Sequence, residues 1–241
     1  IGSEGTLGIV VEATLTLTDP PPAQQVMLLA LPRMQDLMDV FACLRTHLRL
    51  SAFEFFTDHA LDHVVAHGAQ RPFDTDVPFY ALAEFDADEA VALAAFEALS
   101  RAGQVLDGVI AQSLAQAAQL WRLREGITES IGRYSPYKND IAVRVSQVPA
   151  FMTRMDALFA REYPEFEVVW FGHVGDGNLH ISILPPADLP VDAFQATCAR
   201  VTDLLGQVLQ EFGGTVSAEH GVGLLKKPYL HFTCSAPEIE L

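Results

Sequence analysis

The chain has 241 residues, half of them apolar, and its 15 lysines and arginines against 31 aspartates and glutamates give a formal net charge of −16. This length and apolar content indicate a folded protein of one large or two small domains and exclude a disordered chain. The acidic balance argues against nucleic acid as a partner, because phosphate binding requires a basic surface.

The three cysteines, Cys43, Cys198 and Cys234, are far apart and fall in no metal-type spacing. Such an odd, unclustered set is typical of reduced thiols in a cytosol-like compartment. No apolar run approaches the roughly 18 residues that span a bilayer, so we expect no transmembrane segment. We therefore predict a cytoplasmic protein and leave peripheral contact with a membrane open.

The N-terminal segment begins with a glycine-rich loop, IGSEGTLGI, which would let the backbone approach a ligand closely. Apolar and polar residues then alternate over 11–18, which predicts a strand with one polar face. Three consecutive prolines end this strand and form a stiff linker. We therefore predict that residues 1–22 are the tail of a preceding domain and that residues 23–241 form a domain of their own.

Strands and helices alternate through the rest of the chain. The expected elements are strand 24–32, helix 34–50, strand 52–57, helix 58–68, strand 77–86, helix 86–103, strand 104–112, helix 115–134, strand 138–146, helix 148–164, a hairpin over 166–186 and helix 191–214. The strands look half covered, which favours an antiparallel or mixed sheet with helices on one face.

The segment 171–183, FGHVGDGNLHISI, has the Asp-Gly pair that most strongly predicts a tight hairpin turn. If Asp176 and Gly177 are the central turn residues, His173 and His180 lie opposite each other with Cβ atoms roughly 4.5–5.5 Å apart. Two imidazoles at that distance can share one divalent metal ion. The alternative is a polar hairpin that binds no ligand.

Glu219, in the glycine-rich segment FGGTVSAEHGVG, offers a third metal ligand. Two histidines and one carboxylate leave coordination positions open for water or substrate, as in catalytic metal sites. His220 is better suited to proton transfer, because an imidazole titrates near neutral pH. The alternative is an ordinary polar loop.

Three histidines, His59, His63 and His67, recur every four residues along an expected helix. This spacing would permit a metal site on one helix face, although a solvated face is the favoured interpretation.

A second set could bind an acidic substrate. Arg124 and Thr128 are four residues apart and share a helix face, and Lys138 follows that helix. The guanidinium group, the hydroxyl and the ammonium group could together hold a carboxylate. The alternative is that the arginine simply solvates the helix.

Five segments resemble, in the same order, those of the FAD-linked D-2-hydroxy-acid dehydrogenases: GSEGTLGI, LWRLREGITES, YKNDIAV, GHVGDGNLH and SAEHGVGLLKK. This family includes D-lactate dehydrogenases, D-2-hydroxyglutarate dehydrogenases and the flavin subunit of glycolate oxidase. The resemblance covers the C-terminal FAD-linked oxidase domain, the cap domain of a vanillyl-alcohol-oxidase-type flavoprotein. It implies an α+β fold with a largely antiparallel sheet, helices on one side and two ferredoxin-like halves.

The resemblance also implies roles for single residues. His173, His180 and Glu219 would hold a divalent metal, zinc in well-understood members, which binds the substrate hydroxyl and carboxylate. His220 would accept the hydroxyl proton while a hydride passes to the flavin. The product would be a 2-oxo acid, formed from D-2-hydroxyglutarate or D-lactate, and the electron acceptor is not specified.

The substrate carboxylate would be bound by Arg124, Thr128 and Lys138, as in the D-2-hydroxyglutarate branch. Two departures keep a smaller acid such as lactate open: the spacing from Thr128 to Lys138 is one residue shorter than expected, and Ser182 stands where that branch has asparagine. Contacts with FAD would come from the N-terminal loop, at Gly2, Ser3, Glu4, Gly5, Thr6 and Ile9.

Most of the FAD site is expected in a domain before Ile1, and a family segment, Asn-Pro-Gly-Lys, is expected after Leu241. We therefore predict that the chain alone is inactive. A homodimer stays open. The alternatives are a stand-alone metal-binding module and a metal-dependent hydrolase, but neither explains the GSEGTLGI segment.

Overall fold

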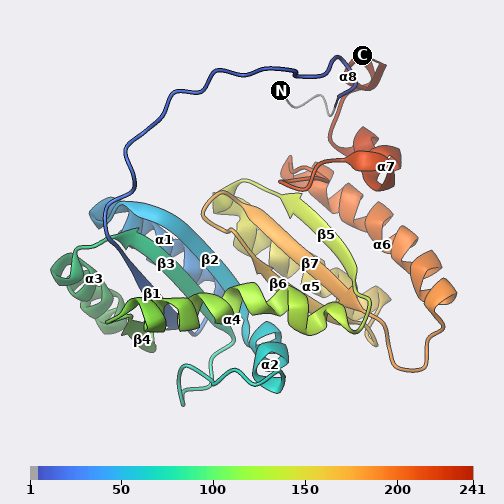
Figure 1. Cartoon of the computed structure of the whole chain (residues 1–241). Coiled ribbons are helices and arrows are strands. Elements are labelled where there is room, and N and C mark those ends of the chain that lie inside the picture. Colours follow the sequence, from blue (N-terminus) through green and yellow to red (C-terminus); the bar gives the residue numbers. More distant parts are fainter. Residues whose placement is uncertain (1–4, 241) are drawn as a thin grey trace.

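The computed structural model describes residues 5–240, and its central element is a seven-stranded antiparallel sheet (Figure 1). The strands are β1 Gln24–Leu31, β2 Leu50–Thr57, β3 Phe79–Asp86, β4 Asp107–Ile110, β5 Tyr137–Ala142, β6 Glu167–Gly172 and β7 Asn178–Leu184. Their order across the sheet is β4-β1-β3-β2-β6-β7-β5, and every neighbouring pair is antiparallel.

The first half of the sheet has the expected ferredoxin-like arrangement. Its elements follow the order strand, helix, strand, strand, helix, strand, with α1 Met34–His47 after β1 and α3 Glu89–Arg101 after β3. The spatial order β4-β1-β3-β2 separates β1 from β2 and β3 from β4, the two pairs that α1 and α3 join. A short helix, α2 Asp58–Ala66, lies in the connection between the neighbouring strands β2 and β3.

The second half repeats this arrangement with a reduced last strand. β5 is followed by α5 Val148–Glu162, then by β6 and β7, and then by α6 Val191–Phe212. A single bridge between Ala142 and Thr215 stands in the position of a fourth strand beside β5. Both halves therefore have the expected ferredoxin-like order, and they meet where β2 pairs with β6.

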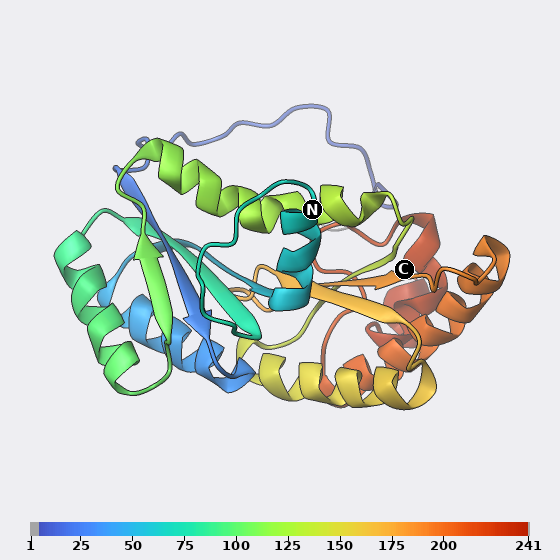
Figure 2. The same cartoon turned by 90° about the horizontal axis from the view of Figure 1, so that it is seen from below.

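Helices cover both faces of the sheet, which corrects the expected one-sided arrangement (Figure 2). The buried residues of α1, α3, α5 and α6 form one core with one sheet face. A second core on the opposite face is formed by α2 and by α4 Leu114–Gly132, the long helix that joins the two halves. The physical reason is visible in β1, where Met27 and Leu28 point to opposite faces and both are fully buried.

One of the remaining elements lies within the second half, before α5, and the other three follow that half. They are η1 Val145–Gln147, α7 Gly223–Lys226, η2 Lys227–Phe232 and α8 Ala236–Glu240. None of the helices within residues 5–240 is both long and apolar enough to cross a membrane.

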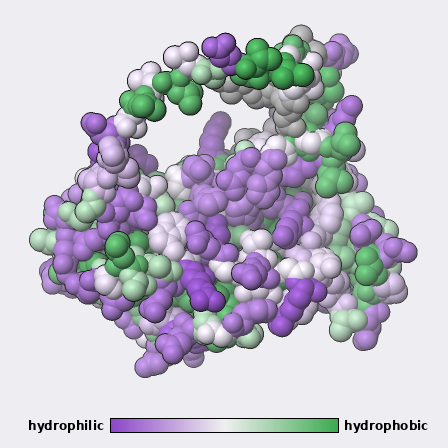
Figure 3. Space-filling view, viewed as in Figure 1, coloured by the Kyte–Doolittle hydropathy of each residue, from purple (hydrophilic) through white to green (hydrophobic). Residues whose placement is uncertain are grey.

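The expected strand over 11–18 is wrong for this chain. These residues have no regular structure, and Val11 and Leu17 are 93% and 90% exposed. A strand needs a neighbour to satisfy its backbone groups, and none of the residues from 5 to 240 pairs with this segment. Figure 3 shows hydrophobic side chains along the tail, which arches away from the rest of the molecule. The assignment of residues 1–22 to a preceding domain stays a prediction.

Candidate metal and substrate site

The hairpin between β6 and β7 has a different register from the expected one. Phe171, not His173, pairs with His180. The connection is a five-residue turn, 173–177, in which the carbonyl of His173 accepts hydrogen bonds from the backbone N–H groups of Asp176 at 3.2 Å and Asn178 at 3.3 Å. The shift is two residues, so both histidines keep the same sheet face. Their ring centroids are 5.3 Å apart, as the metal hypothesis requires.

Glycine at position 177 is required by the turn. Gly177 has a φ of +85°, and a Cβ atom there would collide with the carbonyl oxygen of Val143. The same glycine accepts a hydrogen bond from the Val143 N–H at its carbonyl oxygen, at 3.1 Å. The turn that carries His173 is therefore held against the chain after β5.

Asp140, on β5, positions the segment that carries Glu219 and His220. Its Oδ2 atom accepts hydrogen bonds from the backbone N–H groups of Ala218, Glu219 and His220, at 3.2, 3.0 and 2.9 Å. Lys226 Nζ donates to the Asp140 carbonyl oxygen at 2.7 Å. Three consecutive N–H groups form a cradle for one carboxylate oxygen, so the Ala-Glu-His segment is fixed beside β5.

The predicted metal ligands converge on one carboxylate oxygen. Glu219 Oε1 lies 3.3 Å from His173 Nε2, 3.4 Å from His180 Nε2 and 3.7 Å from His220 Nε2. Donor atoms of Asp140, His180, Glu219 and His220 also lie within 4.8 Å of one another. The donor chemistry fits a divalent cation, and it makes His220 an alternative ligand beside the three expected ones.

The cluster is closed on the sheet side and open on the other. The His180 side chain is 11% exposed, whereas that of His220 is 61% exposed. Burial, with the nearby charges of Arg124 and His173, lowers the pKa of His180 to about 4. His180 is therefore a neutral imidazole at physiological pH, which is the form that binds a metal ion.

Glu54, a buried residue of β2, orients His173 and was missed in the sequence. Its Oε1 atom accepts a 2.8 Å hydrogen bond from His173 Nδ1. This hydrogen bond is the main cause of the raised pKa of His173. One carboxylate among the phenylalanines of AFEFFT was the available signal, because an acidic residue is buried only with a partner.

Arg124 reaches the same place from α4, the helix that covers this face of the sheet. Its Nε atom lies 3.0 Å from Glu54 Oε2, and its guanidinium carbon lies 4.9 Å from the centre of the Phe171 ring. Burial lowers the pKa of Arg124, and the charge of Glu54 opposes that effect. Its Nη2 atom is buried without a hydrogen-bond partner among the described residues. An unpaired guanidinium N–H next to the histidines can receive a carboxylate oxygen.

Thr128 and Lys138 are less closely tied to the cluster. Both are exposed, and the structure from residue 5 to 240 records no hydrogen bond or ion pair of either side chain. Lys138 pairs with Ser182 in the sheet, and strand alternation places it on the face of Asp140 and His180. Their role in substrate binding stays a prediction.

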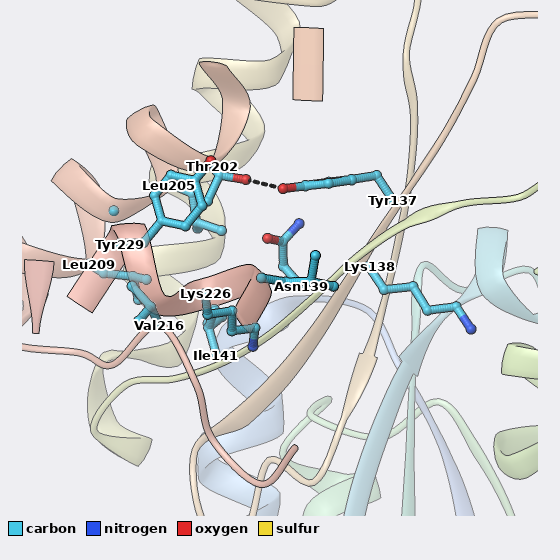
Figure 4. A pocket seen from close by; sticks show the side chains of 12 residues that line it. Tyr137, Lys138, Asn139, Ile141, Thr202, Leu205, Leu209, Val216, Lys226 and Tyr229 are labelled. Carbon is cyan, nitrogen blue, oxygen red and sulfur yellow. Dashed lines mark hydrogen bonds between the residues drawn. The ribbon is translucent and has the colours of Figure 1, made fainter. Parts of the chain in front are cut away.

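A separate cavity of about 270 Å³ lies behind β5 (Figure 4). It is bounded by β5, α6 and the C-terminal helical segments, and Tyr137 and Thr202 share a 2.7 Å hydrogen bond at its rim. Figure 4 shows the Lys138 side chain pointing away from the other lining residues. The cavity is on the opposite face of β5 from the histidines, so it is not part of their site.

The expected flavin contacts are the least defined part of the site. Gly2, Ser3 and Glu4 lie outside the described residues, and Gly5, Thr6 and Ile9 lie in the exposed tail. These contacts stay predictions.

A comparison with known protein families identifies the class of protein to which this chain belongs. Residues 20–241 match the model described as FAD linked oxidases, C-terminal domain, and the chain belongs to this family. Membership confirms the resemblance that the sequence motifs indicate and links the protein to FAD.

Among individual relatives, the chain is 62% identical to a D-2-hydroxyglutarate dehydrogenase of Xanthomonas citri pv. viticola, covering 100% of this chain and 52% of that protein. It is 48% identical to a D-2-hydroxyglutarate dehydrogenase of Stutzerimonas stutzeri, over 100% and 53% of the two chains. Identity is 33% with a putative mitochondrial D-lactate dehydrogenase of Schizosaccharomyces pombe, over 100% and 48%. The chain spans about half the length of these relatives.

Solved structures confirm the expected α+β cap-domain fold. An alkyldihydroxyacetonephosphate synthase superposes with a TM-score of 0.60 at 13% identity, over 99% of this chain and 48% of that one. The 4-ethylphenol oxidase from Gulosibacter chungangensis superposes with a TM-score of 0.55 at 11% identity, over 87% and 48%. At such low identity the likeness concerns the fold alone.

Proposed function

We propose that the chain is the substrate- and metal-binding domain of an FAD-dependent dehydrogenase that oxidises a D-2-hydroxy acid to the 2-oxo acid. D-2-hydroxyglutarate is the first candidate substrate, because the relatives at 62% and 48% identity carry that name. D-lactate is the second, on the 33% relative and on Ser182.

The observation that carries the proposal is the convergence of His173, His180 and Glu219 beside an unpaired arginine N–H. The three donor atoms would hold a divalent cation, with zinc as the first candidate. Arg124 Nη2 would hold a substrate carboxylate oxygen. A cation and a buried, unpaired guanidinium N–H beside it fit a small acid that carries a hydroxyl group next to its carboxylate.

When bound, the cation would lower the pKa of the substrate hydroxyl, and FAD would take up the hydride from the neighbouring carbon. His220 Nε2 would accept the hydroxyl proton, because its side chain stands at the open edge of the cluster. Its Nδ1 atom lies 3.8 Å from Asp140 Oδ2. The negative carboxylate would favour the imidazolium that forms.

Asp140 is suited to this supporting role. Burial raises its pKa, but hydrogen bonds from the His220 and Glu219 backbone and the charges of His220 and Lys226 lower it by more, so the net pKa is below the ordinary value. The Asp140 carboxylate is therefore ionised at neutral pH.

The test uses the protein with its flavin domain. Turnover of D-2-hydroxyglutarate and D-lactate is followed with an artificial electron acceptor before chelation, after chelation and after zinc is restored. Chelation should abolish turnover and zinc should restore it. Turnover that survives removal of the metal would contradict the catalytic-metal proposal.

Two substitutions separate the ligand from the base. Glu219→Gln should lose both the bound metal and turnover, whereas His220→Gln should keep the metal and lower kcat by about 100-fold or more. If His220→Gln also loses the metal, His220 is a ligand and not the base.

The chain alone should bind little FAD and show no dehydrogenase activity. Activity of the isolated 241 residues would contradict this statement. The alternatives, a metal-binding module without catalysis and a metal-dependent hydrolase, predict no flavin reduction by any hydroxy acid in the complete protein.

A further inference from the structure

A second group of metal-ligating side chains lies on α2 and at the first residue of β6, at the other end of that strand from His173. His59 Nε2 and His63 Nε2 both approach Glu167 Oε1, at 3.0 and 2.5 Å. The three donor atoms lie within 4.8 Å of one another. We propose that His59, His63 and Glu167 form a second divalent-metal site, separate from the one assigned to His173, His180 and Glu219.

The helix α2 and the strand β6 bring the three side chains together. His59 and His63 are four residues apart on α2, so their side chains lie on one helix face. Glu167 is the first residue of β6, which the same helix packs against. His67, the next histidine in the row, turns its Nδ1 atom to the His63 carbonyl oxygen at 2.9 Å. The third ligand therefore comes from the neighbouring strand and not from the helix.

The donor set of the cluster suits a divalent cation. Two imidazole nitrogens point at one carboxylate oxygen, and each contact is favourable only if a proton or a cation lies between the atoms. Among the described residues no lysine or arginine forms an ion pair with Glu167. Two histidines and a carboxylate suit Zn²⁺ and leave positions open for water.

One side of the proposed site is buried and the other is exposed to solvent. The His63 side chain is 12% exposed and its ring meets the Tyr134 ring edge-on, with centroids 5.6 Å apart. His59 is half exposed. His63 is therefore held in place by packing while an ion could enter beside His59.

The position of the cluster indicates what a bound ion would do. α2 belongs to the first half of the sheet and Glu167 to the second. Between the halves, β2 and β6 pair through only two residue pairs, Phe55 with Gly172 and Phe56 with Phe171. An ion bound to α2 and β6 would fasten the two halves together, so the site is structural and should not be needed for the chemistry of a substrate.

The test is metal stoichiometry in the full-length protein. After chelation and re-addition of ZnCl₂, elemental analysis should find two zinc ions per chain in the wild type. His59→Asn and Glu167→Gln should each bind one, and His67→Asn, at the C-cap of the same helix, should bind two. Unchanged stoichiometry in His59→Asn and Glu167→Gln would overturn the proposal, as would a wild type whose single zinc ion is lost in Glu219→Gln.

A stability measurement provides a second readout that is independent of activity. In the Glu219→Gln background, Zn²⁺ at about 100 times its Kd should raise the Tm by about 5 °C or more. Adding His59→Asn, a substitution at a half-exposed residue that should leave folding intact, should abolish this shift. A Zn²⁺-dependent shift that persists in the double variant would contradict the proposed site. If the second site exists and the first does not, Glu219→Gln will retain the wild-type zinc content, so the two proposals fail separately.

Discussion

His173 Nδ1 is bound to Glu54 Oε1 at 2.8 Å, and its other ring nitrogen, Nε2, faces Glu219 Oε1 at 3.3 Å. A carboxylate that accepts from Nδ1–H leaves the Nε2 lone pair free for a metal ion. The bond also crosses the junction of the two halves, because Glu54 lies on β2 and His173 follows β6. One half of the molecule therefore orients a proposed ligand that belongs to the other.

The first prediction concerns this bond. Glu54→Gln keeps the shape of the side chain but removes the charge that holds His173 and Arg124. Zinc affinity of the proposed site should fall by about 10- to 100-fold, the usual effect of losing the group that orients a ligand histidine. The affinity is measured by calorimetry in a His59→Asn background, so that the second proposed site does not contribute.

Glu84→Gln is the matched control. Glu84 lies on the neighbouring strand β3, where its carboxylate accepts hydrogen bonds from Trp121 and Ser51 and does not contact the histidines. Its substitution should leave zinc affinity unchanged. Equal losses in the two variants would show that Glu54 has no special role.

A second prediction tests the turn that carries His173. Gly177 and Gly68 both have positive φ, at +85° and +95°, but only at Gly177 would a Cβ atom meet another atom. Gly68→Ala should cost about 1 kcal/mol of unfolding free energy for its backbone conformation alone. Gly177→Ala should cost at least about 2 kcal/mol more, because the collision with the Val143 carbonyl forces the turn to move. Urea denaturation of both variants measures the difference; similar values would contradict the tight contact between the turn and Val143.

Local patterns were enough to predict most of the fold. Period-two strands and three–four helical spacing predict the elements from β1 to α6, since each pattern acts within a few residues. The second core was missed because the apolar run 26–31 of β1 was not interpreted as a strand buried on both faces. The predicted strand at 11–18 was wrong, because a periodic pattern does not supply the neighbouring strand that a β-strand needs for its backbone hydrogen bonds.

The site was partly predictable for the same reason. His173, His180, Glu219 and Arg124 lie in short motifs, and the structure places them together. The hairpin register was wrong by two residues, because the turn uses five residues and not the two that Asp-Gly predicts. Glu54 and Asp140 were missed, because their roles depend on contacts with residues more than 75 positions away, such as Asp140 with the backbone of Ala218.

A third prediction concerns thiol reactivity. Cys198, on α6, is fully buried, and burial raises its pKa to about 12, so its thiolate fraction at pH 8 is about 10⁻⁴. Cys234 is only half-buried. Iodoacetamide should therefore modify Cys234 in the folded protein while Cys198 reacts only after unfolding, as followed by peptide mass spectrometry. Equal labelling rates in the folded state would contradict the packing of α6; unfolded protein, in which both react, is the control.

A fourth prediction follows from His180, whose pKa is lowered to about 4 by burial and by the charges of Arg124 and His173. In the unfolded chain this histidine titrates near 6.5, so its contribution to stability is complete above pH 6.5 and is lost as the pH falls toward 4. The loss should be about 3 kcal/mol over that window. The raised pKa of His173 has the opposite effect on stability, because its contribution is lost as the pH rises above 6.5. The lowered pKa of Asp140 changes stability only below about pH 4.

The measurement is urea denaturation with chelator present, at several pH values between 4 and 6.5. His180→Gln should flatten the decline relative to the wild type, because its side chain takes up no proton on unfolding. His47→Gln, at an exposed position at the end of α1, should leave the decline as it is. If His180→Gln and the wild type lose stability in parallel, the neutral, buried state of His180 is wrong, and with it the argument that this imidazole is ready to bind a metal ion.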